Sequence, residues 1–399
     1  CYDGNECWLS VHRDFPDVRL VFAPPSSVGK FGWDNDNWEW PRHTGDFCVF
    51  RIYADSLNQP APYSPSNVPY HPEVVAPISL EGYQPGSFCM TIGYPGSTNR
   101  YLSSYGIEQT MKSQHQAQTE IRGIKQKLWK EAMNRDNTLR IMYAAKYDES
   151  SNYWKNSIGT VRSIRKLHVL EKKRAREEQL RRWINSQPAE REKLLHLLTD
   201  LELNYSQTLP SSRAFAYLVE CFFNGSELIQ LAFDVLNLDT EAAEEEVVKS
   251  LTKLARKYSD YYEPLDRRVT KALFKAYREK VDAEFLPEFY HAIDTLYQGD
   301  VEAFVDTLFN HTKLSSTEGL RLALHNDSTY QIYQDPAISL CIDLLTQVFY
   351  LKSLSDEPLT QIARNERRLN DALRRMDAHG RHYPDANGTM RLSYGTIGG

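Results

Sequence analysis

The sequence is short of cysteine and of long hydrophobic runs, and each shortage excludes a class of protein. Its six cysteines stand at positions 1, 7, 48, 89, 221 and 341, with no CxxC pair and no Cys/His spacing that suits zinc. Cys1 and Cys7 could form a disulfide, but so sparse a pattern does not indicate a redox compartment. No apolar run approaches about eighteen residues, so we expect no transmembrane helix.

Basic charge and the common catalytic motifs are lacking too. A net charge of -6 and an isoelectric point near 6.0 argue against a general nucleic-acid binder. The motifs HExxH, GxSxG and GxGxxG do not occur. Residues 26–30 resemble the end of a P-loop, but Pro24 stands where the first glycine is required. A calcium-loop pattern that starts at Asp34 is interrupted by Trp38.

The distribution of proline divides the chain, whose 399 residues predict two to three domains. Residues 1–100 hold twelve of the nineteen prolines, and short apolar or alternating runs predict strands at 18–22, 47–53, 74–78 and 88–92. From about residue 101 apolar residues recur at helical spacing, up to a last helix over about 358–378. Strand character returns at 390–397. This order predicts strands in 1–100 and 383–399, with an inserted helical domain over 101–382.

One stretch, residues 31–46, is unusually dense in functional side chains. It reads FGWDNDNWEWPRHTGD and holds three tryptophans, four acids, two asparagines and a histidine. Aspartate and asparagine favour turns, and aromatic packing stiffens a loop, which is the setting in which sites are often built. Composition alone also allows a packed tryptophan corner with surface acids.

Residues 29–55, GKFGWDNDNWEWPRHTGDFCVFRIYAD, resemble the signature of the S46 family of serine peptidases, the bacterial dipeptidyl peptidases 7 and 11. Further matches lie at residues 23–32, 93–106, 151–159 and 390–396, in the family's order. Trp33 departs from the pattern, because the family usually has a second glycine there. The resemblance implies an α+β fold, a chymotrypsin-like double β-barrel with a large inserted α-helical domain. It also implies an enzyme that releases dipeptides from the free N-termini of peptides.

The resemblance assigns roles to four residues. Asp46 falls at the acid of a Ser-His-Asp triad, where it would orient the histidine and stabilise its protonated form. Asn37 and Asn152 fall at positions that hold the substrate's α-amino group, and Trp38 would form a wall beside that amine. Read without the resemblance, Asp46 could pair with Arg42 or form a turn, Asn37 could be a turn residue, and Asn152 could cap a helix.

The triad's other members are expected outside this sequence. The family's histidine would precede Cys1, and its serine would follow Gly399 in a GNSGSP-like loop, a motif that does not occur here. The chain has no signal peptide and does not start with methionine, so we expect an internal piece of a longer protein that is inactive alone. The choice between acidic and hydrophobic P1 side chains would also depend on that missing segment.

By the same resemblance, the parent protein needs no cofactor or catalytic metal, acts in the periplasm or otherwise outside the cytoplasm, and forms a homodimer. Two alternatives remain open from the residues alone. A glycoside hydrolase could stack sugars on the tryptophans and use Asp34, Asp36, Glu39 or Asp46 as an acid/base pair. A non-catalytic peptide-binding or scaffold module could instead act through the helical domain.

Overall fold

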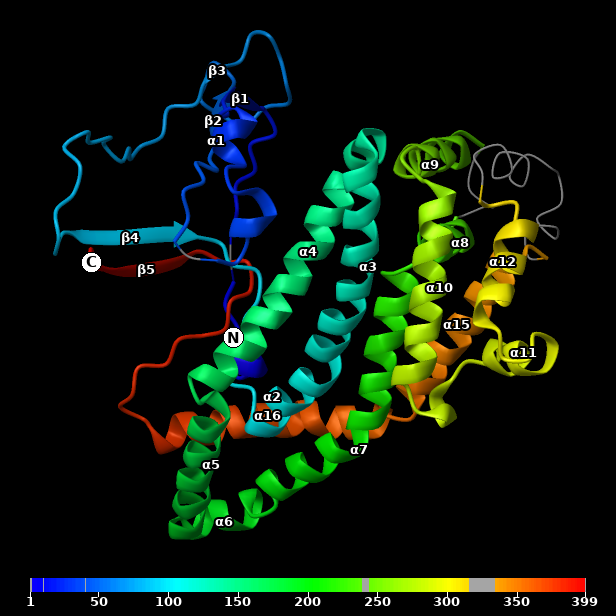
Figure 1. Cartoon of the computed structure of the whole chain (residues 1–399). Helices are drawn as coiled ribbons and strands as arrows, with labels where there is room; N and C mark the ends of the chain where they lie inside the picture. The colour runs from blue at the N-terminus through cyan, green and yellow to red at the C-terminus, as the bar shows by residue number, and fades with distance from the viewer. Residues whose placement is uncertain (1, 10, 40, 239–243, 316–333, 399) are drawn as a thin grey trace. The chain divides into compact units, whose positions relative to one another are not determined.

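The computed structural model describes residues 2–9, 11–39, 41–238, 244–315 and 334–398, and the chain forms two compact units (Figure 1). The strand unit comprises Cys1–Tyr101 together with Asn370–Gly399. The helical unit comprises Leu102–Leu369. Helices dominate and the strands form two small sheets, so the predicted α+β class is confirmed.

The first sheet of the strand unit is antiparallel, with β1 (Val18–Phe22) beside β2 (Val49–Ala54) and β2 beside β3 (Val68–Pro69). The strand predicted at 18–22 is confirmed at both ends, and the next begins two residues later than predicted. The strand predicted at 74–78 is wrong, because these residues adopt no regular structure. Pro72 lies two residues before the run and Pro77 lies within it, and neither has the N–H that a strand ladder needs.

The second sheet joins distant parts of the sequence. β4 (Phe88–Gly93) pairs antiparallel with β5 (Arg391–Thr396), and the two arrows lie side by side in Figure 1. The register runs from Phe88 opposite Thr396 to Gly93 opposite Arg391. Strands predicted at 88–92 and 390–397 are therefore confirmed, and the entire helical unit lies between them in sequence.

The helical unit is built from helices of very different length. Their bounds are α2 (Ser104–Thr110), α3 (Gln116–Arg135), α4 (Asn137–Lys166), α5 (Val169–Ser186), α6 (Pro188–Leu194), α7 (Leu197–Leu218), α8 (Glu227–Leu236), α9 (Glu244–Lys257), α10 (Glu263–Lys280), α11 (Phe289–Leu296), α12 (Val301–His311), α15 (Pro336–Ser353) and α16 (Asp356–Met376). Two π-turns, η3 (Met111–His115) and η4 (Val219–Phe223), precede α3 and follow α7. α16 matches the predicted last helix to within two residues at each end and continues into the strand unit.

An aromatic core organises the helical unit around η4. Phe222 packs edge-on against Phe274 at 4.8 Å and against Phe289 at 5.8 Å between ring centroids. Tyr277 and Tyr290 stack beside them, and both are buried. Edge-to-face and offset aromatic contacts add specific geometry to the burial of apolar area, so this cluster fixes how α10 and α11 pack on η4.

Two carboxylates hold the point where the chain enters the helical unit. The N–H and hydroxyl groups of Ser103 donate to Glu366 of α16, and those of Ser104 donate to Glu177 of α5. Tyr205 of α7 donates its hydroxyl to Glu366 Oε1 at 2.8 Å. Since all of these side chains are buried, the carboxylates satisfy backbone donors at the start of α2 that water would not reach.

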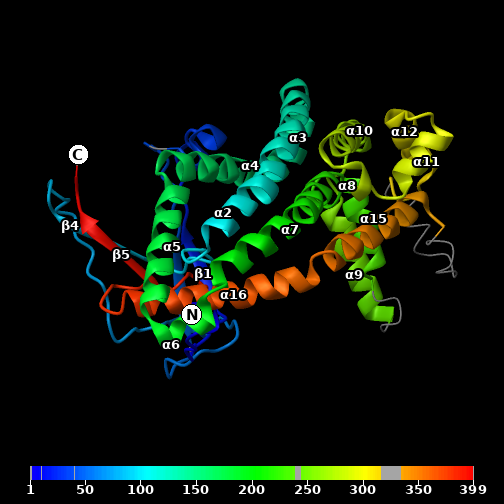
Figure 2. The same ribbon diagram turned by 90° about the horizontal axis from the view of Figure 1, so that it is seen from below.

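Among the described helices, no single one is long and apolar enough to cross a membrane. α15 and α16 pass that test only when taken together across a bend of 53° (Figure 2).

Candidate functional site

The signature loop, residues 26–46, turns on a glycine. It opens with α1 (Ser26–Gly29) and continues through the 3-10 helix η2 (Trp33–Asp36), which Gly32 precedes with φ +78°. A Cβ added at Gly32 would lie 1.8 Å from Asp36 Oδ2. Only glycine combines that left-handed backbone with room for the Asp36 carboxylate.

Two tryptophans in the loop also adopt the left-handed region. Trp33 has φ 41° and Trp38 has φ 58°. Such values are uncommon for residues with a Cβ and cost free energy unless the surrounding structure imposes them. At Trp33, where the S46 pattern usually has a second glycine, the tryptophan therefore adopts a backbone conformation that glycine would adopt easily.

Four hydrogen bonds close the loop on itself. Arg42 donates from Nη2 and Nε to the carbonyl oxygen of Asp36, at 2.7 and 3.2 Å. Thr44 Oγ1 donates to the carbonyl oxygen of Phe31 at 2.6 Å, and the N–H of Gly45 donates to that of Val28 at 3.0 Å. Arg42 therefore closes the loop through a backbone carbonyl group. An ion pair between Arg42 and Asp46 was one alternative role for Asp46, and no contact between them is found among the described residues.

The loop presents three of the predicted site residues. Asn37, half-buried, follows η2 directly and donates its N–H to the carbonyl oxygen of Asp34 at 3.2 Å. Trp38 is 54% exposed, and Asp46 is exposed. We expected the strand to begin one residue after Asp46, but β2 begins at Val49, so this expectation is wrong by two residues.

The fourth predicted residue, Asn152, belongs to the helical unit. It lies inside α4, whose N-cap is Asp136, so the helix-cap alternative for Asn152 is wrong. The side chain is exposed and lies on the same helix face as Glu149, three residues before it. Asn37, Trp38 and Asp46 lie in the strand unit. The binding of one substrate amine by both Asn37 and Asn152 therefore stays a prediction.

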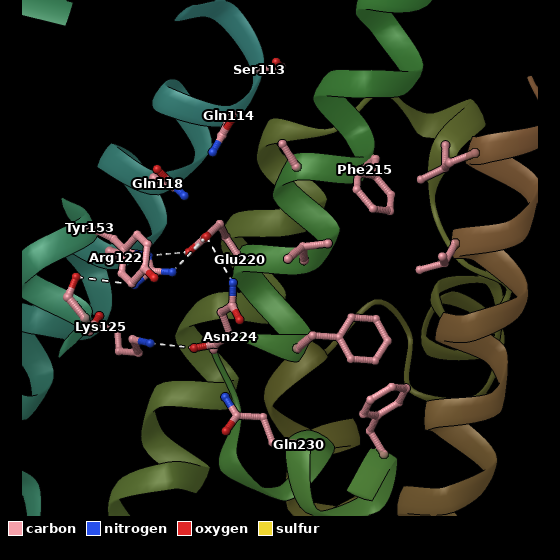
Figure 3. Close-up of a pocket in the computed structure, with 18 of the residues that line it drawn as sticks. Ser113, Gln114, Gln118, Arg122, Lys125, Tyr153, Phe215, Glu220, Asn224 and Gln230 are labelled. Carbon is pink, nitrogen blue, oxygen red and sulfur yellow. Dashed lines mark hydrogen bonds and ion pairs between the residues drawn. The ribbon is translucent and has the colours of Figure 1, made fainter. Parts of the chain in front are cut away.

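A large pocket lies wholly within the helical unit and was missed from the sequence (Figure 3). Its volume is about 1460 Å³. Gln114 of η3 and Gln118, Arg122 and Lys125 of α3 contribute a polar wall. The polar spacing of these residues, at intervals of three and four, is the signal that could have revealed it. The aromatic and aliphatic lining comes from other helices and includes Phe215, Phe223, Phe233, Val348 and Phe349.

A buried ion pair forms the polar centre of this pocket. Arg122 donates from Nε to Glu220 Oε2 at 2.7 Å and from Nη2 to Glu220 Oε1 at 3.1 Å. Asn224 Nδ2 donates to the same Glu220 Oε1 at 3.1 Å. The guanidinium also lies over the ring of Tyr153, 4.9 Å from its centroid. This two-pronged geometry orients both charges in a site that is shielded from water.

Lys125 lies one helical turn from Arg122 and is 4% exposed. Its Nζ donates to the carbonyl oxygen of Asn224 at 2.5 Å and lies 4.7 Å from the ring centroid of Trp129. Burial, followed by the charge of Arg122, lowers the pKa of Lys125 to about 8. Perturbed groups of this kind gather at functional sites, because the environment that shifts a pKa is also one that binds ligands.

The structure offers no metal centre in the residues it describes, since no three His, Cys, Asp or Glu side chains there are grouped to hold an ion. The acids of the signature loop are consistent with this. A calcium-like reading of residues 34–37 gains no support, because that segment forms the 3-10 helix and its cap.

Comparison with known proteins gives one consistent result. The family model described as Peptidase S46 matches residues 1–399. The chain is 42% identical over 404 residues to dipeptidyl-peptidase 7 of Porphyromonas endodontalis, covering 100% of this chain and 49% of the relative. It is 33% identical over 416 residues to an Asp/Glu-specific dipeptidyl-peptidase of Flavobacterium psychrophilum, covering 100% and 56%.

Solved structures agree. The crystal structure of Porphyromonas endodontalis DPP11 in complex with the dipeptide Arg-Glu matches with a TM-score of 0.81 and 30% sequence identity. The match covers 96% of this chain and 56% of that chain. The chain thus spans about half the length of the relatives it matches.

Proposed function

Because this chain belongs to the Peptidase S46 family, we propose that it forms part of a serine-type dipeptidyl peptidase that releases dipeptides from free peptide N-termini. The observation that carries the proposal is the closed signature loop. Its hydrogen bonds hold Asn37, Trp38 and Asp46 on one short, constrained segment. Constrained loops position reacting groups more accurately than mobile ones.

The proposed parent fold is a chymotrypsin-like double β-barrel with the helical unit as an insertion. The pairing of β4 with β5 supports the insertion, since these strands flank the helical unit in sequence and still form one ladder. The predicted domains 1–100, 101–382 and 383–399 follow from the same proposal. The second barrel would be completed by sequence beyond these 399 residues.

Asp46 is the triad acid of the proposed reaction. A serine oxygen attacks the scissile carbonyl carbon, and a histidine takes the serine proton and passes it to the departing amine. Water then hydrolyses the dipeptidyl ester and releases the dipeptide. Asp46 accepts a hydrogen bond from the histidine Nδ1–H, which fixes the tautomer and stabilises the imidazolium. Its exposed position after Gly45 leaves the carboxylate accessible to a histidine from outside this chain.

The amine of the substrate is the proposed anchor. An ammonium group only donates hydrogen bonds, so the amide oxygens of Asn37 and Asn152 can bind it with less desolvation than buried carboxylates would need. Trp38 adds an aromatic face for the cation. Two extended residues span roughly 7 Å, so a fixed amine sets the distance to the cut bond. This ruler explains why the product is a dipeptide.

The parent is proposed to act outside the cytoplasm, as a homodimer, on peptides with free N-termini and without a cofactor. The DPP11 structures with the dipeptides Arg-Glu and Arg-Asp support a peptide as the ligand. The 399-residue chain alone is proposed to be inactive, since it supplies one triad member.

The decisive experiment compares Asp46→Asn with Glu39→Gln in the full parent protein. With substrates whose N-termini are free, Asp46→Asn is expected to lower kcat by about 10⁴, because the histidine loses its orienting acceptor. Glu39 is an exposed acid in the same loop without a role in this mechanism, so Glu39→Gln is expected to remain active. Blocking the substrate N-terminus by acetylation should abolish hydrolysis by the wild type.

Unchanged activity of Asp46→Asn would refute the proposal. Absence of peptide hydrolysis by the wild type, together with hydrolysis of oligosaccharides that Glu39→Gln abolishes, would favour the glycoside hydrolase alternative, in which Glu39 belongs to an acid/base pair. Tight dipeptide binding without hydrolysis by the parent protein would favour the peptide-binding module.

A further inference from the structure

The pocket of the helical unit contains a buried cation without a carboxylate partner. Within the described ranges, Lys125 makes no ion pair; its one hydrogen bond is to the carbonyl oxygen of Asn224. The ammonium group has three donors, so two are left for other acceptors. Burying an ammonium group is costly unless something compensates its charge.

The carboxylates that act on Lys125 are either bound to another cation or exposed to solvent. Glu220 is bound by Arg122 in the bidentate pair. Glu227 accepts from Lys146 Nζ at 2.6 Å. Glu149 of α4 is the remaining carboxylate that acts on Lys125, and it is exposed. No carboxylate in the described ranges is therefore bonded to the Lys125 ammonium group, whose remaining donors favour an anion.

The rest of the polar lining suits an amide-containing ligand. Gln114 and Gln230 line the pocket, and their side chains make no hydrogen bond in the described part of the chain. Gln118 accepts from Ser157 Oγ at 2.5 Å, which leaves its NH₂ group available. A glutamine amide both donates and accepts, and this matches the C=O and N–H of a peptide bond. A plain fatty acid would leave these groups without partners.

The apolar lining suits hydrophobic side chains. Phe215, Phe223, Phe233 and Phe349 line the pocket, and Phe349 is 69% exposed. Figure 3 shows Phe215 across the pocket from α3. The volume of about 1460 Å³ is above the range usual for single small molecules, which is about 300–1,000 Å³. It leaves room for a peptide of a few residues.

We propose that this pocket binds a short peptide by its free C-terminal carboxylate. Lys125 holds the carboxylate, the glutamine amides bind the peptide backbone, and the aromatic wall receives apolar side chains. The site is distinct from Asp46, Asn37 and Trp38, because they belong to the other unit, and Asn152 of the helical unit is not among the residues that line the pocket. It does not require the proposed function, although a dipeptidyl peptidase would release ligands of this class.

The first test leaves the pocket residues unchanged and compares two forms of one ligand. Isothermal titration calorimetry compares the dipeptide Leu-Phe with its C-terminal amide, in an Asn37→Ala background that weakens the amine site of the proposed function. A charge-assisted hydrogen bond to Lys125 predicts that the free acid binds at least about tenfold more tightly than the amide. Equal affinities would overturn the proposal, and so would equally tight binding of decanoate.

The second test uses Lys125→Met with Lys127→Met as its control. Lys127 lies two residues away on α3 and is exposed. Lys125→Met should lose at least about tenfold in affinity for the free acid and nothing further for the amide, whereas Lys127→Met should bind like wild type. Affinity of the wild type for the acid should also fall as the pH rises through about 8, where Lys125 loses its charge.

Both tests measure binding in the Asn37→Ala background. A failure of the proposed peptidase function would therefore leave their outcome unchanged. If Lys125→Met does not fold, the acid-versus-amide comparison still decides the proposal. Unchanged binding of the acid by folded Lys125→Met would refute it.

Discussion

Replacing Lys125 with methionine is expected to stabilise the protein at neutral pH, although it removes a hydrogen bond. Burial lowers the pKa of Lys125 from 10.5 to about 8. Since a tenfold change in an ionisation equilibrium corresponds to about 1.4 kcal/mol, the charged lysine lowers the free energy of unfolding by about 3 kcal/mol at about pH 7. Methionine has a similar length and no charge to bury.

The lost hydrogen bond offsets part of this gain. The Asn224 carbonyl would lose its donor, at a cost of about 1 kcal/mol. The net expectation for Lys125→Met is therefore an increase of about 2 kcal/mol in the free energy of unfolding at about pH 7. A lysine that only supports the fold would give the opposite sign.

The pH dependence has a definite sign. The folded-state pKa of Lys125 lies below its unfolded value, so unfolding takes up a proton between the two. The penalty is fully present below about pH 8 and disappears as the pH rises toward about 10.5. The advantage of Lys125→Met over wild type should consequently shrink by about 2 kcal/mol between about pH 7 and about pH 9.5.

Urea unfolding followed by far-ultraviolet circular dichroism measures this, because helices dominate the unit that contains Lys125. Wild type, Lys125→Met and the exposed-site control Lys127→Met are compared at both pH values and one ionic strength. Lys127→Met should remain within about 0.5 kcal/mol of wild type. Destabilisation by Lys125→Met at neutral pH, or a difference that does not change with pH, would refute the reasoning.

Two further predictions concern the signature loop and the buried ion pair. Gly32→Ala should lower the free energy of unfolding by about 2 kcal/mol, because alanine is strained at this positive φ and its Cβ would displace Asp36. Gly82→Ala is the control: Gly82 has φ +74° but open space around it, so this substitution should cost about 1 kcal/mol. Equal losses in the two variants would contradict the role of Asp36. Glu220→Gln should lower the free energy of unfolding, measured by thermal or urea unfolding, by about 3 kcal/mol, because buried Arg122 would lose its counter-ion. Glu149 is exposed and serves as the control. A loss for Glu220→Gln no larger than that for Glu149→Gln would contradict this prediction.

Strand and helix positions followed from local pattern where neighbours in sequence determine the outcome. Residues 18–22 are a short, mostly apolar run and form β1, and α16 follows its apolar spacing to within two residues. The run at 74–78 has strand-like composition but forms no strand, because pairing depends on a partner and on backbone donors, and Pro77 within the run lacks one. The pattern predicted both strands around the helical unit, whereas their mutual pairing became visible only in the structure.

For the candidate site, too, one part could be predicted from the sequence and another part could not. The density of tryptophan, asparagine and aspartate marked the signature loop from sequence alone. Its closure by Arg42 on a carbonyl oxygen, and the left-handed backbone at Trp33 and Trp38, depend on dihedral angles that composition does not encode. The pair of Arg122 with Glu220 joins residues 98 positions apart, so no local spacing could have indicated it.

The hydrogen bonds from Ser103 to Glu366 have a consequence for the order in which the protein folds. Closing the ladder of β4 and β5 across an unfolded segment of about 300 residues would cost about 5 kcal/mol of chain entropy. Once the helical unit has folded, the hydrogen bonds between Ser103 and Glu366 hold its two ends close together. Most of the chain entropy that pairing β4 with β5 requires has then already been lost. Helices rich in local contacts also form faster than strand pairs between distant segments. The helical unit is therefore expected to fold first and to serve as the preassembled bridge on which the β4–β5 sheet closes.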